Sequence, residues 1–560
     1  MSSISIVVQA VSEATLTIRH LYYFVGALVL YKVIHQLFLY PYLLSPLRSV
    51  PGPPIGEPIF GQSIKIFRYE TGIVQREWIK KYGPVVRVVG PVGMERLMFM
   101  TPEALHHMLV KEWLDCPRPQ YLRNILGLVA GYGLLTVTGN EHRQMRKVMN
   151  PAFSIPNLMA QTDMYYEPIE GKVVPSRVLS SQRYVFTSLI QVLSSQLPGP
   201  EGAVLPVYEW MSKATLDIIC ETAFGYHTDS LHNPHNELAE AYEKLLSLQS
   251  GPNMARLVLF VSLPGGAKFL SSNLAYKIRG MFSYIRFFAP LTPLIDSTHC
   301  IRDISKQILD QKMKETSESG VSVDDTHTKK DIMSILVRAR QADLNKDRTA
   351  YAMSDAAMMD QVLTFLGAGH ETTASGLTWT LWLLANDKTN QQRLRDEVRP
   401  IMAADPRPDY KTLKNMQWLD CVVMESLRVM PPVPLTVRTT AKTDYIEGVL
   451  VPKGTLLHIS IRNVNTWQTI WGEDAEEFHP ERWLNLPKAY NSTFSLLSFI
   501  AGPHGCIGKT MAIVEMKAVL AALITNFEFE PAYDGQQARP SAAITMKPAD
   551  GMPLRIRRVT

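Results

Sequence analysis

The chain has 560 residues, of which 46% are hydrophobic and 19% charged, a composition typical of a folded protein with a large core and not of a disordered one. Its formal net charge of +5 is small for this length and gives no reason to expect nucleic acid as a partner. Its five cysteines are widely spaced and form no CxxC pair, which argues against a disulfide framework and against a zinc site.

The first apolar segment, residues 21–44, is long enough to cross the hydrocarbon core of a bilayer and carries tyrosines at both ends. We therefore expect residues 1–45 to form a single N-terminal membrane anchor; a buried core helix is the alternative. More basic residues follow this segment than precede it, which places the remaining chain in the cytosol by the positive-inside rule. An endoplasmic reticulum membrane protein with a cytosolic body is the resulting expectation.

A proline-rich stretch, residues 46–58, follows the anchor. Because proline interrupts both helices and sheet ladders, we expect an extended connector with neither helix nor strand. The chain beyond it has no internal repeat and no second linker, so residues 59–560 are expected to form one domain.

The body alternates between a short β portion and long helical stretches. Residues 84–100 read as two strands around a Gly-Pro turn, and residues 101–112 as a helix capped by a threonine. The helical period dominates from about residue 141 to 403, interrupted by a polar loop at 314–331, and residues 439–461 read as short strands. The fold class is therefore mainly α with a smaller β portion.

A lone cysteine, Cys506, lies in a glycine-rich loop directly before an apolar helix that begins near Lys509. Backbone N–H groups and a helix N-terminus would lower the pKa of its thiol and favour a thiolate. A thiolate without other soft ligands nearby suits the axial position of a haem, although a catalytic nucleophile and an inert buried thiol have the same local pattern.

The spacing of Phe499, Gly502, His504, Cys506 and Gly508 closely resembles the haem-binding loop of the cytochrome P-450 monooxygenases. The resemblance implies a P-450 fold that holds haem b between two helices, with Cys506 as the axial ligand of the iron. The family usually has an arginine at the position of His504, where it binds a haem propionate. Histidine is a weaker and titratable donor, which puts that contact in doubt.

The helix expected at residues 363–384 resembles the oxygen-activation helix of this family through Gly369, Glu371 and Thr372. Its glycines allow another surface to approach the backbone closely. The resemblance implies that the acid and the alcohol relay protons to iron-bound dioxygen. A helix crossing with a solvated acid is the alternative.

Two further motifs match the family. Glu425 and Arg428 share one helical face, and with Arg482 they resemble the Glu–Arg–Arg triad that has a structural role near the cysteine loop. His142 and Arg146 resemble the helix that contacts the haem carboxylates, and Arg438 matches a propionate-binding position. For His142 and Arg146, a solvated basic face is the alternative.

The resemblance implies a monooxygenase that hydroxylates or epoxidises a lipophilic substrate with dioxygen and electrons from an NADPH-dependent cytochrome reductase. A terpenoid or other secondary metabolite is the expected substrate. The alternatives are a fatty-acid, sterol or xenobiotic hydroxylase, and a haem-thiolate isomerase or peroxygenase. We expect the reductase to bind at a basic surface formed by Arg143, Lys147, Lys509 and Lys517. We expect the substrate pocket to be lined by residues 122–135, Phe365, Leu366 and residues 433–437. The apolar stretch 257–270 is expected either to insert into the bilayer and admit the substrate or to form part of the core or a turn.

Overall fold

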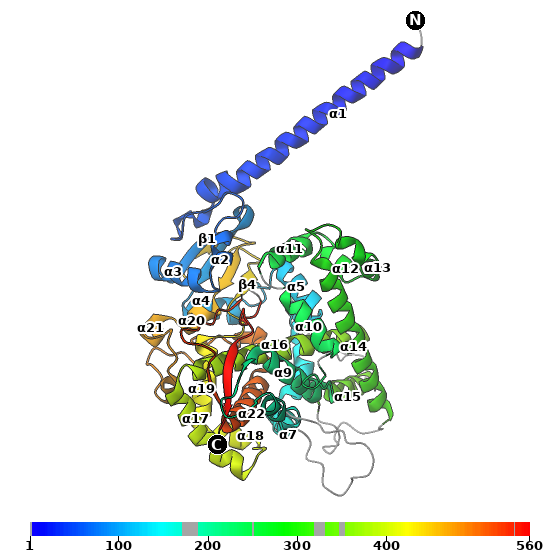
Figure 1. The fold of residues 1–560 in the computed structure, drawn as a ribbon. Helices are drawn as coiled ribbons and strands as arrows, with labels where there is room; N and C mark the ends of the chain where they lie inside the picture. Colours follow the sequence, from blue (N-terminus) through cyan, green and yellow to red (C-terminus); the bar gives the residue numbers. More distant parts are fainter. Residues whose placement is uncertain are drawn as a thin grey trace.

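The computed structural model describes residues 3–170, 189–233, 235–248, 251–318, 331–345, 353–541 and 544–559, so most of the polar loop expected at 314–331 lies outside the described residues. Helices build most of the body, and the small sheets lie near the end from which α1 projects and along one side (Figure 1). The chain belongs to the mainly α class, as predicted.

The α-helices are α1 (Ser3–Ile34), α2 (Ser63–Arg68), α3 (Ile73–Tyr82), α4 (Pro102–His106), α5 (Gln120–Ala130), α6 (Gly139–Met149), α7 (Ile155–Glu170), α8 (Leu189–Ser195), α9 (Val207–Phe224), α10 (Glu237–Ser247), α11 (Gly251–Ser262), α12 (Gly266–Leu270), α13 (Asn273–Phe282), α14 (Leu291–Glu318), α15 (Ile332–Asn345), α16 (Asp355–Ala385), α17 (Lys388–Ala404), α18 (Tyr410–Asn415), α19 (Gln417–Val429), α20 (Ile461–Asn465), α21 (Gln468–Trp471) and α22 (Lys509–Asn526). Short 3-10 and π segments are η1 (His35–Leu44), η2 (Pro46–Ser49), η3 (Pro91–Gly93), η4 (His107–Lys111), η5 (Asn150–Phe153), η6 (Pro480–Leu484) and η7 (Gly502–His504).

The strands are β1 (Val85–Val89), β2 (Glu95–Phe99), β3 (Ala203–Pro206), β4 (Thr436–Thr439), β5 (Asp444–Ile446), β6 (Val449–Val451), β7 (Leu456–Ile459), β8 (Phe527–Pro531) and β9 (Pro553–Arg558). The largest sheet has the order β1-β2-β7-β4, in which β2 and β7 run parallel and the other pairs antiparallel. It joins the hairpin predicted at 84–100 to β4 and β7, and the stretch predicted as short strands at 439–461 contains β5, β6 and β7, so both sequence predictions are confirmed.

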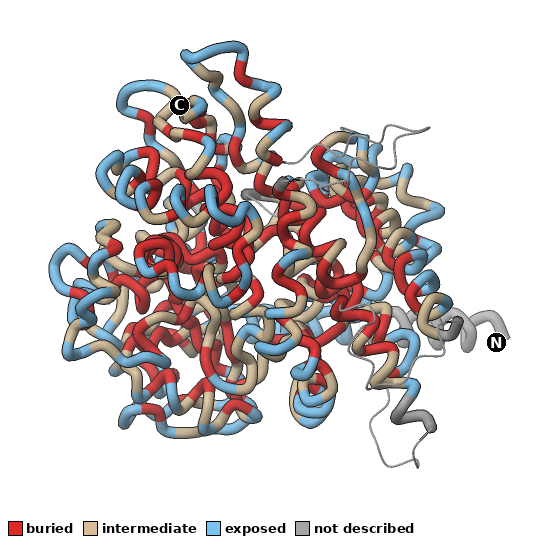
Figure 2. Tube along the Cα trace, turned by 90° about the horizontal axis from the view of Figure 1, so that it is seen from below, coloured by how far each residue is buried: buried red, intermediate tan, exposed pale blue. Residues whose placement is uncertain are grey.

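The long helix α16 runs through the centre of the helical part. It begins where the Ser354 hydroxyl accepts a hydrogen bond from the Ala357 backbone N–H, and most of its side chains on every face are buried. Such an all-round apolar helix needs neighbours on all sides, and it packs against α5, α9, α14, α19 and α22. Buried residues accordingly concentrate in the interior of the body (Figure 2).

The N-terminal helix α1 continues into η1 as one rod that projects from the body (Figure 1). Residues Arg19–Leu44 form a 26-residue helical stretch that is long and apolar enough to cross a membrane, and residues 19–34 are exposed, while Pro41 near its end is buried against the body. This finding agrees with the length and composition of the expected anchor.

The proline-rich connector differs from the expectation in one respect. Residues Pro46–Ser49 form the 3-10 turn η2, because the Ser45 hydroxyl accepts from the Leu47 N–H at 3.0 Å and proline is tolerated in a first helical turn. The Pro51 carbonyl then accepts from the backbone N–H of Arg87 at 2.9 Å. The connector is therefore fastened to β1 over part of its length.

Candidate active site

The loop around Cys506 turns sharply before α22, which begins at Lys509 as predicted. The backbone N–H of Cys506 donates to the Phe499 carbonyl at 2.8 Å. Gly502 has φ +72°, and a Cβ there would lie 2.1 Å from the carbonyl oxygen of Leu109, so this position requires glycine. Gly508 has negative φ and no close neighbour at its Cβ position, so its backbone does not require glycine.

Cys506 is exposed by accessible area, although many protein atoms surround its thiol. Burial raises the pKa of this thiol, while a hydrogen bond from the Gly508 backbone and the cations of Arg146 and Lys509 lower it by less. The predicted direction was wrong because the sequence displays the donors but not the desolvation of the anion. A metal cation reverses this balance, since a coordinating thiol loses its proton.

Three guanidinium groups lie close to this loop. Arg438 is buried, donates to Thr436 and to the Val437 carbonyl at 3.0 Å each, and has no partner for Nη2. Arg118 donates to Nδ1 of His504 at 3.2 Å, and Arg146 donates to a backbone carbonyl of the loop. In the described part of the chain, no carboxylate forms an ion pair with any of the three arginines. Burial lowers the pKa of Arg118 to about 10, which reflects this uncompensated charge.

Two imidazoles complete the cluster. The rings of His142 and His504 are 4.0 Å apart between centroids, and both pack against the indole of Trp113. Burial, reinforced by Arg118, lowers the pKa of His142 to about 4 and that of His504 to about 2, so both rings are neutral at pH 7. Nδ1 of His142 is buried without a hydrogen-bond partner among the described residues.

The missing counterpart of this cluster is an anion with several acceptor oxygens. Two propionate groups of a haem would fit this description: Arg438, Arg118 and His142 could donate to them, and Cys506 could supply a thiolate to the iron. Arg118 was missed at the level of sequence, where it stands between Pro117 and Pro119 with no periodic or motif signal. The family usually has an arginine at the position of His504. In this chain Arg118 lies beside that histidine.

On α16, the acid and the alcohol point to different partners. The carboxylate of Glu371 is buried and accepts a hydrogen bond from the hydroxyl of Thr545 in the C-terminal segment. Burial raises the pKa of Glu371 to about 7, although Thr545 and Lys547 lower it. The hydroxyl of Thr372 is partly exposed and donates to the Ala368 carbonyl at 2.8 Å. The structure shows no hydrogen bond between Glu371 and Thr372.

The glycines of α16 serve close packing. A Cβ at Gly369 would lie 2.6 Å from the Ile219 side chain of α9, and one at Gly376 would lie 3.1 Å from Met516 of α22. The predicted close approach of other surfaces is thus present. Gly369 therefore allows close packing against α9, whereas from the sequence it was assigned to cofactor binding.

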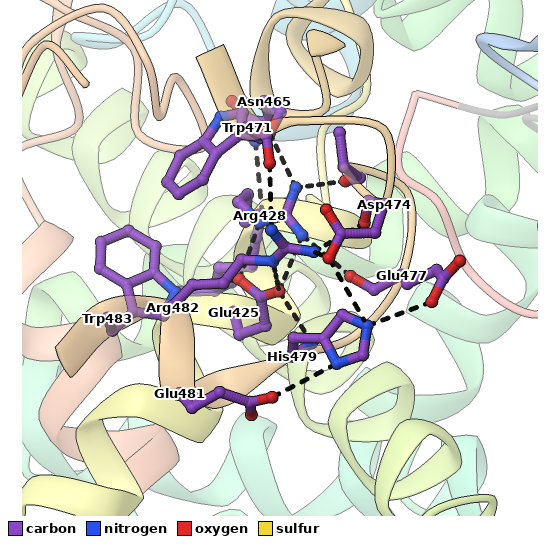
Figure 3. A network of polar contacts seen from close by, with 12 residues as sticks. Glu425, Arg428, Asn465, Trp471, Asp474, Glu477, His479, Glu481, Arg482 and Trp483 are labelled. Carbon is purple, nitrogen blue, oxygen red and sulfur yellow. Dashed lines mark hydrogen bonds and ion pairs between the residues drawn. The ribbon is translucent and has the colours of Figure 1, made fainter. Parts of the chain in front are cut away.

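The predicted Glu–Arg pair is fully buried at the centre of a polar network (Figure 3). Two parallel hydrogen bonds of 2.7 Å join Arg428 to Glu425. Arg482 lies 3.4 Å from Glu425, but its hydrogen bonds go to Trp471 and Asp474 backbone carbonyls.

Two donors to the Glu425 carboxylate were not predicted. The indole Nε1 of Trp483 donates at 3.0 Å and the backbone N–H of His479 at 2.9 Å. Both lie in the loop that follows α21 and in η6, so this loop is held directly to α19. The network ties the segment preceding the cysteine loop to the helical core.

The expected pocket segment 122–135 packs on α16. Thr364 of α16 donates to the Ala130 carbonyl at 2.8 Å, and Asp360 accepts from the Tyr132 backbone N–H at 3.0 Å. Phe365 and Leu366 are buried nearby in the same core. The stretch 257–270 forms parts of α11 and α12 and exposes Leu259, Leu263 and Phe269 while burying other side chains, so it has a core side and an apolar outer side.

Of the four cations assigned to a partner surface, three are exposed: Arg143, Lys147 and Lys509. Lys517 is not. It is buried on α22, forms an ion pair with Asp420 at 2.6 Å and donates to the Leu413 carbonyl. That assignment was wrong because the helical phase of α22 turns Lys517 toward α18 and α19.

Comparison with known proteins gives a consistent result. The family model for cytochrome P450 matches residues 51–553. The chain is 30% identical over 536 residues to cytochrome P450 monooxygenase sphH of Aspergillus fumigatus, covering 93% of this chain and 90% of that protein. It is also 30% identical to cytochrome P450 monooxygenase 205 of Postia placenta, with 90% of each chain covered. Cytochrome P450 monooxygenase FUM15 of Gibberella moniliformis is 26% identical, with 93% of this chain and 90% of that protein covered.

Proposed function

The chain belongs to the cytochrome P450 family, and on this premise we propose that it is a membrane-anchored monooxygenase that inserts one oxygen atom of dioxygen into a lipophilic substrate by hydroxylation or epoxidation. The observation that carries the proposal is the loop of Cys506 beside a cluster of cations that have no carboxylate partner among the residues the structure describes. Such a cluster fits a haem held by its propionates and by one thiolate.

Haem bound there would supply the activation of dioxygen, and the chain would supply positioning and protons. Arg438, Arg118 and His142 would hold the propionates through the donors described above. Glu371 would hold a proton near neutral pH because of its raised pKa, and Thr545 fixes the orientation of its carboxyl group. Thr372 would offer its hydroxyl on the partly exposed side of α16.

Residues 1–45 are proposed as the anchor in the endoplasmic reticulum membrane, residues 46–58 as the connector and residues 59–560 as the cytosolic catalytic domain. The apolar rod Arg19–Leu44 supports the first of these. The sequon at Asn491 provides a test of topology, since its side chain is exposed in a turn. A cytosolic body leaves Asn491 unmodified in a eukaryotic host, whereas a glycan removable by endoglycosidase would place the body in the lumen.

The electrons are proposed to come from an NADPH-cytochrome reductase that meets the exposed Arg143, Lys147 and Lys509 beside the cysteine loop. Replacing Lys147 by glutamate should raise the KM for the reductase several-fold and weaken the salt dependence of turnover, with the haem spectrum unchanged. The same reversal at the exposed Lys277 of α13, which lies away from the cysteine loop in sequence, serves as the control. Equal KM values for the two variants would refute this docking surface.

A secondary metabolite such as a terpenoid is the proposed substrate. Its support is the apolar lining expected from α5, α16 and the 433–437 segment, together with relatives that are fungal monooxygenases. The acid and alcohol on α16 favour a monooxygenase over a haem-thiolate isomerase or peroxygenase, which does not need proton delivery to dioxygen.

The test of the central proposal is the absorption spectrum of membranes that contain the reduced, carbon monoxide-bound protein. We expect a strongly red-shifted Soret band, typical of thiolate-ligated haem, that is lost in Cys506→Ala. The control is Cys300→Ala, a cysteine on α14 that is only partly exposed and far from the loop in sequence. An imidazole-type band, or loss of the band in both variants, would contradict Cys506 as the ligand.

A further inference from the structure

A further arginine without a counter-ion among the described residues lies on the four-stranded sheet, away from the cluster of Arg438, Arg118 and Arg146. Arg96 of β2 is partly buried, and its Nε is fully buried without a hydrogen-bond partner. Within the described ranges, no carboxylate forms an ion pair with it and none of its nitrogens donates to another residue. A buried guanidinium without an acceptor costs free energy, and such groups are normally paired or bind a ligand.

The strand register separates Arg96 from the haem side of the sheet. Arg96 pairs with Leu456 of β7, and Arg438 of β4 pairs with Leu457. Because neighbouring residues on a strand point to opposite faces, Arg96 and Arg438 lie on opposite faces of the sheet. The propionates that satisfy Arg438 therefore do not satisfy Arg96.

Glu95 does not satisfy it either. This carboxylate is adjacent in sequence but points to the other face, where it accepts from Arg87 Nε at 2.6 Å and from the Ser45 hydroxyl at 2.6 Å. One arginine of the β1–β2 hairpin thus has its partner, and the other has none in the described chain.

Two polar side chains surround Arg96. His458 of β7 lies on the same face, two residues from Leu456, and Tyr121 lies in the first turn of α5. The strand register carries the placement of His458, and the electrostatics accord with it: burial and then the charge of Arg96 lower the pKa of His458, while Arg96 opposes the rise in the pKa of Tyr121 that burial causes. No hydrogen bond of the Tyr121 hydroxyl or the His458 ring is found among the described residues. The three groups offer donors for one anionic acceptor.

The place of this cluster suggests the direction from which a ligand arrives. The turn Pro91–Gly93 between β1 and β2 abuts the lower end of the membrane rod, where a Cβ on Gly93 would lie 2.1 Å from the Gln36 carbonyl oxygen. Arg96 follows this turn by three residues. Val437, in the segment expected to line the pocket, shares the face of Arg96 through its pairing with His458. The cluster therefore lies between the anchor and the expected pocket.

We propose that Arg96, with Tyr121 and His458, binds the carboxylate of an amphiphilic acid substrate whose apolar body extends toward the haem. This inference rests on the proposed monooxygenase function and specifies its substrate class: a lipophilic molecule with one acid group at a distance from the oxidised carbon. A guanidinium recognises a carboxylate by charge-assisted and often bidentate hydrogen bonds.

The test is a binding titration of the full-length haem protein in lipid nanodiscs, followed by the Soret shift. The probes are dodecanoic and hexadecanoic acid, each compared with its own methyl ester, in wild type, Arg96→Gln, Arg96→Lys and the exposed control Arg286→Gln. Comparing the ratio of the ester Kd to the acid Kd between variants cancels the different lipid partitioning of ester and acid, because this partitioning is the same for every variant. We expect a ratio of at least about tenfold, or about 1.4 kcal/mol, in wild type and in Arg286→Gln. The ratio should fall to about twofold in Arg96→Gln and recover in part in Arg96→Lys.

A ratio near one in wild type for both acids, or an unchanged ratio in Arg96→Gln, would overturn the proposal. A wild type without a thiolate-type carbon monoxide spectrum would instead refute the proposed function. A second measurement does not depend on the probe. Arg96→Met should leave the melting temperature of the ligand-free haem protein unchanged or raised, because it removes an unpaired charge. A fall of several degrees would mean that Arg96 is structural and would also overturn the proposal.

Discussion

Glu371 is an acid in the middle of a buried helix, and its protonation is coupled to stability. Burial raises its pKa from 4.5 to about 7. Between these values the folded state binds more protons than the unfolded state, so the free energy of unfolding falls as the pH rises through this window, by about 3 kcal/mol in total. Above about pH 7 this decrease in the free energy of unfolding is complete, and below about pH 4.5 it has not begun.

Glu371→Gln keeps the shape of the side chain and removes this titration. The variant should match the wild type in melting temperature near pH 5 and exceed it near pH 8, because only the wild type carries the buried anion there. Thermal scans at both pH values measure the difference. Thr545→Val is the companion variant: it removes a hydrogen bond that favours the ionised form, so it should shift the window to higher pH. A constant difference between Glu371→Gln and wild type across this range would contradict the assigned pKa.

The hydroxyl of Thr372 has a matched neighbour for comparison. Thr372 and Thr373 both donate to the carbonyl four residues back, at 2.8 and 3.1 Å, but only Thr372 is partly exposed while Thr373 is buried. Thr372→Ala should divert a large share of NADPH consumption from product to peroxide, whereas Thr373→Ala should leave this coupling near the wild-type value. Product and peroxide formed per NADPH oxidised give the answer. Equal coupling in both variants would remove Thr372 from proton delivery.

At the scale of single elements, the Glu425 network joins α19 to η6 through donors that surround one buried carboxylate (Figure 3). Trp483→Phe deletes one of these donors and should destabilise the protein by about 1.5–3 kcal/mol, since the acceptor is charged and buried. Trp471→Phe removes an indole of the same size whose Nε1 has no hydrogen-bond partner among the described residues, so it should cost less. The melting temperatures of the two variants test this prediction. A larger decrease in melting temperature for Trp471→Phe than for Trp483→Phe would contradict the role of Trp483.

The elements also show how far the sequence can predict this molecule. The periodicity of apolar residues and the positions of turn residues were enough to predict β1, β2, α16 and α22, because each of these elements is encoded by a local pattern. The spacing of Glu425 and Arg428 was enough for their pairing. Arg118 could not be found, because its contact to His504 spans 386 residues of chain and no local feature marks it. Thr545 was missed for the same reason, and burial reversed the expected pKa direction at Cys506.

At the scale of the whole molecule, the apolar rod and the apolar outer side of the α11–α13 region lie toward the same end of the body (Figure 1). Tyr284, Met281 and Leu263 are among the most exposed apolar side chains there. Deleting residues 1–45 should therefore weaken membrane association without abolishing it. Full-length protein should stay in the pellet after a carbonate wash, and the truncated protein should be released. Release of both would contradict a spanning anchor.

The junction between rod and body is itself hydrogen-bonded. Arg87 donates to the Pro41 carbonyl at 2.6 Å, and the Ser45 hydroxyl donates to Glu95. A helix that is clamped at its foot transmits rotation, and each residue added to it turns everything beyond by about 100°. The orientation of the far end of the rod relative to the body is thus set by the length of the helix in residues. One alanine inserted within the rod would turn the part beyond it by about 100° relative to the body, and seven, close to two full turns, would restore the original orientation.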